Sequence, residues 1–171
     1  MLPRWLPTTW PLLAALAAVA LLGVAHAFES FAHLAPCDLC LHQRTVYWVA
    51  AAVGLVGWAA GKGTKRPVLF SVASLLLGLI FLFQVGLAAY HAGVEWHWWP
   101  GPTACTGRGA VSAGALNALV SGAKVARPSC DVAAWRFAGL SMAGWNAIAA
   151  LGLCLISFSA MGARRRGLEP V

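Results

Sequence analysis

The sequence predicts an all-α membrane protein, folded as one bundle of four transmembrane helices with a long second outer loop. Hydrophobic residues make up 60% of the 171 residues and charged residues only 10%, whereas a soluble domain is about 25% charged. The charges are also clustered, which leaves four apolar runs that reach the lower limit of about 17 residues for a span. A segment inside lipid must be helical, because no water is present there to pair with its backbone.

The first predicted span covers residues 9–28, an Ala- and Leu-rich run that follows Arg4. It has a second interpretation, because Ala25-His26-Ala27 resembles the small-residue cleavage site of a secretory signal peptide. Prolines at positions 3, 7 and 11 and a single arginine make a poor charged leader, so we expect the span to be retained. An intact-mass measurement distinguishes the two interpretations, and the rest of the chain emerges on the same side in both.

Three further spans are predicted at residues 44–60, 68–90 and 142–160. The second is barely long enough, so we expect it to end near the interface. The outer loops then cover about residues 29–43 and 91–140, and the whole chain, 1–171, forms a single domain. Within the second loop, residues 110–125 carry apolar side chains at helical spacing among polar ones, which predicts a short interfacial helix lying on the membrane surface.

Lys and Arg residues near the span ends indicate the orientation of the bundle. One side carries most of them at high density: Arg4, Lys62, Lys65, Arg66, Arg164, Arg165 and Arg166. The others are spread mainly over the long second loop: Arg44, Arg108, Lys124, Arg127 and Arg136. We therefore assign both termini to the cytoplasm and the cysteine-containing loops to the periplasm. The net charge of +7 reflects this topology and contact with anionic lipid, and no basic patch interleaved with aromatics indicates nucleic-acid binding.

This orientation places Cys37, Cys40, Cys105 and Cys130 outside, in a compartment where disulfides persist. Cys37 and Cys40 are three residues apart, so they can close and open a disulfide easily. Four cysteines allow three pairings; we expect Cys105 to bridge Cys130 in a flexible, water-exposed loop, where a disulfide exchanges readily. Cys154 lies inside the fourth span, where we interpret it as a small buried apolar side chain.

The Cys37–Cys40 pair lies where the second helix should begin, with Pro36 suited to its first turn. The positive end of a helix favours the thiolate, the reactive form of cysteine. Arg44, one helical turn after Cys40, could favour a Cys40 thiolate or hold a carbonyl oxygen of a ligand, or it could simply reach the headgroups. His91, at the outer end of the third span, could bind a ligand at the same depth or face the headgroups.

A lone Cys-x-x-Cys is compatible with other chemistry. A thioredoxin fold requires a βαβ pattern that this sequence lacks, and c-type haem requires His directly after the second cysteine, where Leu41 stands. A structural zinc site and purely structural disulfides remain open, although Cys105 and Cys130 lack the close spacing of a second zinc-ligand pair. Bound metal after purification would indicate the first of these.

Four segments of the chain together resemble one known family. Residues 36–44 read Pro-Cys-Asp-Leu-Cys-Leu-His-Gln-Arg, Tyr90-His91 ends the third span, and residues 135–145 lead into the fourth. Cys105 and Cys130 stand in Pro-Thr-Ala-Cys and Ser-Cys-Asp sequences. Over nearly its whole length the chain resembles the bacterial disulfide-bond formation protein B family (DsbB). Vitamin K epoxide reductase relatives also have four spans and two cysteine pairs, but there the loop pair comes first, whereas here it follows.

The resemblance implies a quinone-dependent protein-dithiol oxidase of the bacterial inner membrane. A periplasmic DsbA-like thiol oxidase would attack the Cys105–Cys130 disulfide at Cys105, and Cys130 would then attack Cys37 and release Cys40. With Arg44 and His91 close by, Cys40 would pass electrons to a membrane quinone, either ubiquinone or menaquinone, and no metal is expected. The alternative is a non-enzymatic membrane scaffold with structural disulfides, in which both pairs stay oxidised whatever the quinone supply.

Overall fold

The computed structural model describes residues 6–103, 105 and 128–166, so the expected interfacial helix at 110–125 lies outside the described residues. The described chain is mostly helical, with α1 at Leu6–Phe31, α2 at Asp38–Gly63, α3 at Val68–Glu95 and α5 at Met142–Arg166. Each of these helices is long and apolar enough to cross a membrane, in α5 over Met142–Met161. The predicted fold class is therefore confirmed, and the chain is a multi-pass membrane protein.

The helices extend further than the apolar runs from which they were predicted. The second begins at Asp38 instead of residue 44, so the first outer loop shrinks from 29–43 to residues 32–37. Pro36 consequently lies before the helix and not in its first turn, which corrects the sequence-based placement. Hydropathy follows the thickness of the lipid, whereas a helix continues past it until a cap stops it. The third helix likewise continues beyond residue 90 to Glu95.

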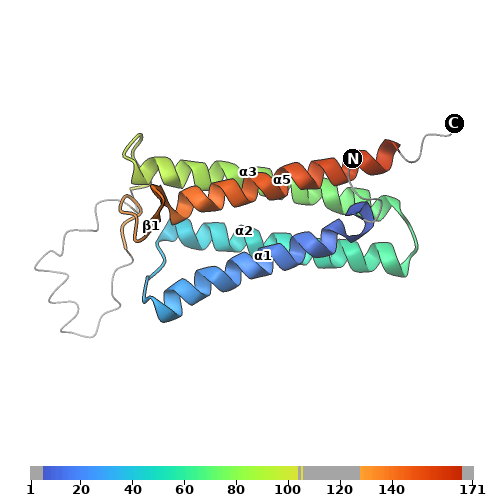
Figure 1. The fold of residues 1–171 in the computed structure, drawn as a ribbon, viewed down its shortest axis with the longest axis horizontal. Helices are drawn as coiled ribbons and strands as arrows, with labels where there is room; N and C mark the ends of the chain where they lie inside the picture. The colour runs from blue at the N-terminus through green and yellow to red at the C-terminus, as the bar shows by residue number, and fades with distance from the viewer. Residues whose placement is uncertain (1–5, 104, 106–127, 167–171) are drawn as a thin grey trace, which may run out of the picture.

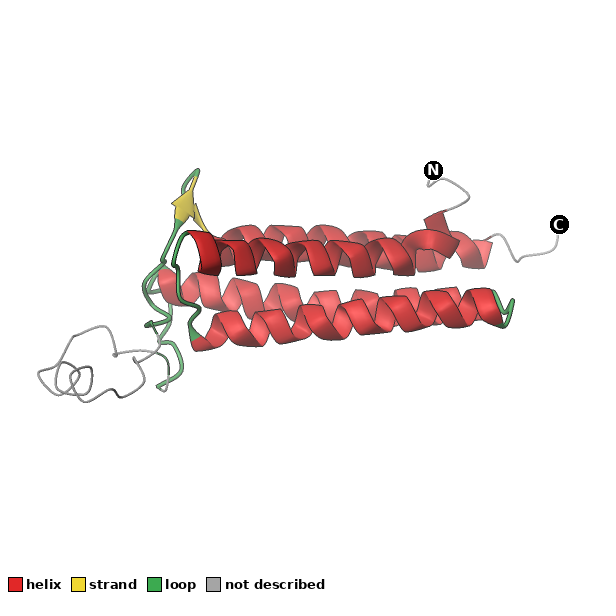
Figure 2. Cartoon of the chain, turned by 90° about the horizontal axis from the view of Figure 1, so that it is seen from below, coloured by secondary structure: helices red, strands yellow, loops and turns green. Residues whose placement is uncertain are grey.

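The helices run antiparallel, and Figure 1 shows both cysteine-bearing segments at one end of the bundle. The basic α2–α3 link, the start of α1 and the end of α5 lie at the opposite end, as the view from below in Figure 2 also shows. This separation agrees with the charge pattern. Neighbouring helices pack as α1 on α2, α2 on α3 and α3 on α5, and α1 touches α5 to close the bundle. As a result, α2 and α5 face each other diagonally across the core.

Small residues allow the helices to approach closely, as expected where lipid supplies no hydrophobic driving force between them. A Cβ added at Gly54 of α2 would lie 2.4 Å from the Pro11 carbonyl oxygen of α1, and one added at Gly57 would lie 2.3 Å from the Ala73 Cβ of α3. Larger side chains fill the core between them, whereas many apolar side chains point outward toward lipid. Cys154 is buried in this core, which confirms its interpretation as a small apolar side chain.

A short β-hairpin that the sequence did not predict precedes α5. Strand β1, Arg136–Phe137, pairs antiparallel with β2, Leu140–Ser141, through a two-residue turn. Both turn residues have positive φ, 49° at Ala138 and 81° at Gly139, which is the backbone that a tight type I′ hairpin turn requires. Ser141 then accepts a hydrogen bond from the Gly144 N–H at 3.2 Å and so caps the start of α5.

Candidate functional site

The first residue of the Cys-x-x-Cys pair is itself the cap of α2. Cys37 has extended backbone angles, and its sulfur accepts a hydrogen bond from the Cys40 N–H at 3.3 Å. A helix leaves its first N–H groups without backbone partners, and a side chain at this position satisfies one of them. Capping therefore turns the Cys37 sulfur back toward Cys40, and the two sulfurs lie 2.7 Å apart.

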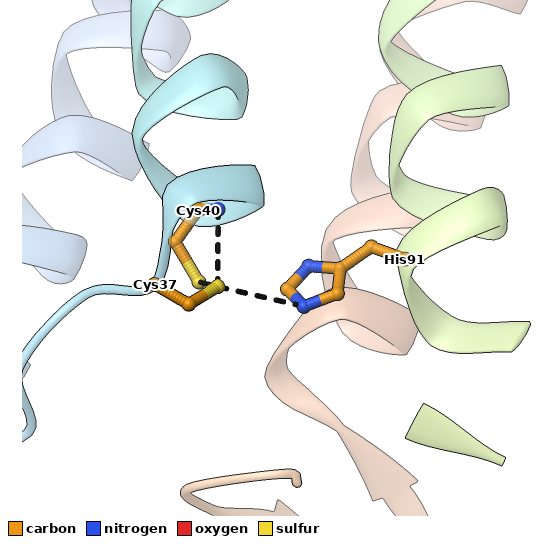
Figure 3. Close-up of side chains that lie close together, drawn as sticks. All are labelled: Cys37, Cys40 and His91. Carbon is orange, nitrogen blue, oxygen red and sulfur yellow. Dashed lines mark hydrogen bonds between the residues drawn. The ribbon is translucent and has the colours of Figure 1, made fainter. Parts of the chain in front are cut away.

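A histidine from another helix faces this pair. Figure 3 shows the ring of His91 reaching from α3 toward the Cys37 sulfur, with 3.6 Å between Nε2 and Sγ. His91 is only 3% exposed, so the interpretation in which it faces the lipid headgroups is wrong. Its contact joins residues 54 positions apart in the sequence, and it places an imidazole directly beside the candidate redox pair.

The thiol of Cys37 is held in its protonated form. The hydrogen-bonded Cys40 side chain and burial together raise the pKa of Cys37 above its ordinary value, and they outweigh the Cys40 backbone N–H, which lowers it. The start of the helix does act on Cys37 in the predicted direction, through this N–H, but the neighbouring sulfur and burial have the larger effect on its pKa. Two sulfurs at this distance cannot both carry a negative charge without strong repulsion, so one of them keeps its proton.

The loop disulfide lies against this pair. Cys105 and Cys130 are bonded to each other in the structure, and they are 3% and 1% exposed. Together with Cys37, Leu39 and Val94 they form one buried cluster, against which Cys40 packs. The expectation of a water-exposed disulfide is therefore wrong. The Cys130 N–H donates to the Cys105 carbonyl at 2.9 Å, and the Cys130 backbone also interacts with the His91 ring, so the loop is bound to the bundle here.

Arg44 has a partner that neither sequence-based interpretation foresaw. Its Nη1 donates to Glu29 Oε2 at 2.5 Å and its Nη2 to the Ala25 carbonyl at 3.2 Å, both on α1. The Arg44 side chain is 14% exposed, so it does not extend freely to the headgroups. Among the described residues these bonds use two of the five N–H donors of the guanidinium, which leaves others to bind a ligand.

Three further polar side chains at the site were missed by sequence reasoning. Gln43 Nε2 lies 2.8 Å from His91 Nδ1, and Gln43 Oε1 accepts from Asn146 Nδ2 at 2.5 Å. The Asn146 Oδ1 in turn accepts from the Tyr47 hydroxyl at 2.5 Å. Polar residues are expensive inside a membrane bundle, and Asn146 in the fourth span could have been noticed on that ground.

Glu95 was also missed as a member of the site. Its Oε1 lies 3.8 Å from His91 Nε2, its side chain is buried, and its charge acts on Cys37 and Cys40. It interacts in turn with Ser141 and Arg136 of the hairpin. The hairpin before α5 therefore adjoins the site.

Replacing Glu95 with glutamine should make Cys37 react faster with an alkylating agent. The Glu95 charge raises the pKa of Cys37, so its removal lowers that pKa and increases the thiolate fraction at any pH below it. A fall of one pKa unit would increase that fraction about tenfold. The Glu95 charge is the smallest of the causes that act on this pKa, after Cys40 and burial, so we expect the rate to rise only about twofold. Peptide mapping after timed iodoacetamide labelling of the reduced protein measures the rate. Glu29→Gln, which removes a carboxylate from α1, should leave it unchanged, and an unchanged rate in Glu95→Gln would contradict this electrostatic coupling.

An apolar groove lies between α2 and α3 beside the cysteine cluster. It has a volume of about 650 Å³ and is lined mainly by aliphatic and aromatic side chains, with His42 and Thr45 as its polar members. Leu39 and Leu87 line this groove and also pack in the cysteine cluster. The site is therefore adjacent to space that suits an apolar, membrane-dissolved molecule.

A metal ion is a less suitable occupant of the cysteine pair. The ligand atoms of Cys37, Cys40 and His91 all lie within 4.8 Å of one another. Two sulfurs on a tetrahedral zinc, each with a bond of about 2.3 Å, would be about 3.8 Å apart, whereas these are 2.7 Å apart. The pair is arranged for sulfur–sulfur chemistry.

Comparison with known proteins agrees with this geometry. A family model described as "Disulfide bond formation protein DsbB" matches residues 7–160. A protein of Dechloromonas aromatica (strain RCB) named "Disulfide bond formation protein B" is 30% identical, over 81% of this chain and 82% of its own. One of the same name from Polaromonas sp. (strain JS666 / ATCC BAA-500) is 31% identical, over 85% of this chain and 88% of its own.

Proposed function

The chain belongs to the DsbB family of disulfide bond formation proteins, and on that premise we propose that it oxidises a periplasmic DsbA-like dithiol protein and passes the electrons to a membrane quinone. Membership of the family indicates a disulfide oxidoreductase within a multi-pass membrane protein. The proposed setting is the bacterial inner membrane, with both termini in the cytoplasm and the cysteines on the periplasmic side. The charge distribution and the common end of the two cysteine pairs support that orientation.

The observation that carries this proposal is the packing of both cysteine pairs into one buried cluster. Electrons move between disulfides only by direct attack of one sulfur on another. A loop disulfide far from the bundle, in water, would have to move in order to reach Cys37, whereas here it already lies in the same buried cluster as Cys37. A non-enzymatic scaffold with structural disulfides needs no such juxtaposition of its two pairs.

The proposed exchange begins at the loop. A thiolate of the partner attacks Cys105, which forms a mixed disulfide and frees Cys130 as a thiolate. Cys130 attacks Cys37, and the bond between Cys37 and Cys40 breaks to leave a Cys40 thiolate. The second partner thiol then displaces Cys105 and completes the disulfide of the partner. Cys105 attacks Cys130, which restores the loop disulfide and releases Cys37.

Cys37 and Cys40 now carry the two electrons taken from the partner. When bound, a quinone supplies an acceptor for two electrons and two protons. The Cys37–Cys40 disulfide re-forms as both thiols give up their electrons and protons, so the net change is oxidation of one dithiol and reduction of one quinone. The apolar groove beside Leu39 and Leu87 fits a lipid-soluble acceptor, and ubiquinone and menaquinone both meet that requirement. Arg44 is the donor proposed to hold it, although its side chain binds α1 and does not line this groove. His91, which the sequence also offered as a donor to the acceptor, faces Cys37 instead.

The test of this function is quinone-dependent oxidation of a purified, reduced DsbA-like protein by the chain in detergent. We expect the partner to lose two thiols for each quinone reduced. If both cysteine pairs stay oxidised when the reduced partner protein is added, with quinone present or absent, the chain is instead a scaffold.

Replacing Arg44 with alanine should raise the apparent KM for quinone about tenfold. The loss of one charge-assisted hydrogen bond corresponds to roughly tenfold in affinity. Because Arg44 also binds Glu29, the matched control is Glu29→Gln, which removes the ion pair and keeps the guanidinium. A KM that rises in Arg44→Ala and not in Glu29→Gln supports ligand binding. Equal changes in both variants would make Arg44 a brace between α1 and α2.

A further inference from the structure

A continuous row of hydrogen bonds leads from Tyr47 on α2, by way of α5, to the redox pair. It runs from Tyr47 to Asn146, from Asn146 to Gln43 and from Gln43 to His91, whose other ring nitrogen faces Cys37. The row joins α2, α5 and α3, and it connects the diagonal pair α2 and α5, which share little direct backbone contact. Tyr47, Gln43 and His91 are buried and Asn146 is half-buried. Polar groups in such a place are tolerated when each finds a partner.

All the donors in this row point in one direction. The Tyr47 hydroxyl donates to Asn146 Oδ1, which turns the Asn146 amide nitrogen toward Gln43 Oε1. Gln43 therefore presents its Nε2 hydrogens to His91 Nδ1. A nitrogen that accepts a hydrogen bond carries no hydrogen itself, so in a neutral ring the hydrogen sits on Nε2.

The Nε2 side of the ring has acceptors that suit this hydrogen. Besides the Cys130 backbone, which also interacts with the ring, Cys37 Sγ lies at 3.6 Å and the Glu95 carboxylate oxygen at 3.8 Å. Both are acceptors, and the carboxylate favours an N–H on the same nitrogen. Gln43 on one side of the imidazole and the acceptors on the other side therefore favour the same tautomer, with the hydrogen on Nε2.

We propose that Asn146 and Tyr47 are positioning residues, which fix His91 in the Nε2–H tautomer and so hold a hydrogen-bond donor against the Cys37 sulfur. The inference deepens the proposed function and, in its effect on turnover, rests on it. In the exchange, Cys37 leaves as a thiolate when Cys105 attacks the Cys37–Cys130 bond. A donor at its sulfur stabilises that thiolate and speeds its departure. No proton is transferred, because His91 only donates a hydrogen bond.

The tautomer of His91 can be read directly by 15N NMR of the reduced protein labelled at histidine, at a pH of about 8 where ordinary histidines are neutral. The His91→Gln variant identifies the resonances. We expect the wild-type ring to be in the Nε2–H form. A wild-type ring with its hydrogen on Nδ1 would overturn the proposal, and this measurement needs no variant that might fail to fold.

Asn146→Leu removes the donor that orients Gln43 while keeping similar volume. We expect a mixture of both tautomers and, because a hydrogen bond to a charged sulfur is weakened, a fall in kcat of about threefold to tenfold. The matched control is Ser157→Ala on the same helix, which removes the buried hydrogen bond of 2.9 Å from Trp10 Nε1 and should change neither the spectrum nor kcat. An unchanged spectrum in Asn146→Leu would overturn the positioning role.

These outcomes separate the inference from the proposed function. The NMR readout requires no partner and no quinone, so an Nε2–H ring in a chain without quinone-dependent activity would contradict the function alone. Full activity together with an Nδ1–H ring would contradict the inference alone.

Discussion

Replacing either Cys37 or Cys40 with serine should reduce quinone reduction to the level of the uncatalysed reaction. The two sulfurs lie 2.7 Å apart at the start of α2, and the proposed transfer to quinone proceeds by re-forming the bond between them. A serine hydroxyl neither forms a disulfide nor accepts attack by another thiolate, so electron transfer from the partner to quinone stops at that residue. The measurement is the loss of quinone absorbance in the presence of a reduced partner protein, with the amount of folded variant matched to wild type.

Cys154→Ala is the control for these two variants. Cys154 is buried in the core, and its sulfur faces the Gly78 carbonyl at 3.5 Å. It belongs to a different buried cluster from the other four cysteines. Turnover should therefore remain close to wild type. If Cys37→Ser or Cys40→Ser retained turnover while Cys154→Ala lost it, the proposed route of electrons would be wrong.

The second large effect is expected at the loop disulfide. A partner variant without its second cysteine cannot complete its own disulfide, so it should remain bonded to wild-type chain at Cys105. The Cys105→Ser variant should form no such adduct and should lose oxidation of the protein partner. Non-reducing electrophoresis shows the adduct, and peptide mapping identifies the cysteine to which the partner is bonded.

A small dithiol provides the control for this prediction. Cys40 is only partly buried, and a small reagent that reaches the Cys37–Cys40 pair does not need the loop. In the double variant Cys105→Ser/Cys130→Ser, quinone-dependent oxidation of dithiothreitol should therefore persist while oxidation of the protein partner is lost. An adduct that still forms in Cys105→Ser would assign the first attack to Cys130.

Much of the fold could be read from the sequence because it depends on composition and on local pattern. Apolar runs locate helices in lipid, and the basic residues at Lys62, Lys65 and Arg66 separate one end of the bundle from the other. The ends of the helices were predicted less accurately. Helix α2 begins six residues before its apolar run, because the Cys37 cap, and not the lipid boundary, determines where it starts.

The arrangement of the site could be read only in part. His91 was singled out as an ionisable residue at the end of a span, but its contact with Cys37 depends on how α3 is rotated against α2. The ion pair of Arg44 with Glu29 and the hydrogen bond of Gln43 with Asn146 join residues 15 and 103 positions apart. Spacing along one helix does not specify which side chain of another helix it meets.

The sequence by itself determined that the chain is a four-span membrane protein and that it carries two cysteine pairs suited to disulfide exchange. Hydrophobicity and residue chemistry are properties of single positions, so they can be read from the sequence without knowledge of the fold. Only the tertiary structure decided that the loop disulfide is buried in one cluster with Cys37 and that His91 is held in a row of hydrogen bonds reaching Tyr47. Those are relations between helices, and they follow from the close packing of a bundle in which each side chain has room for only one arrangement.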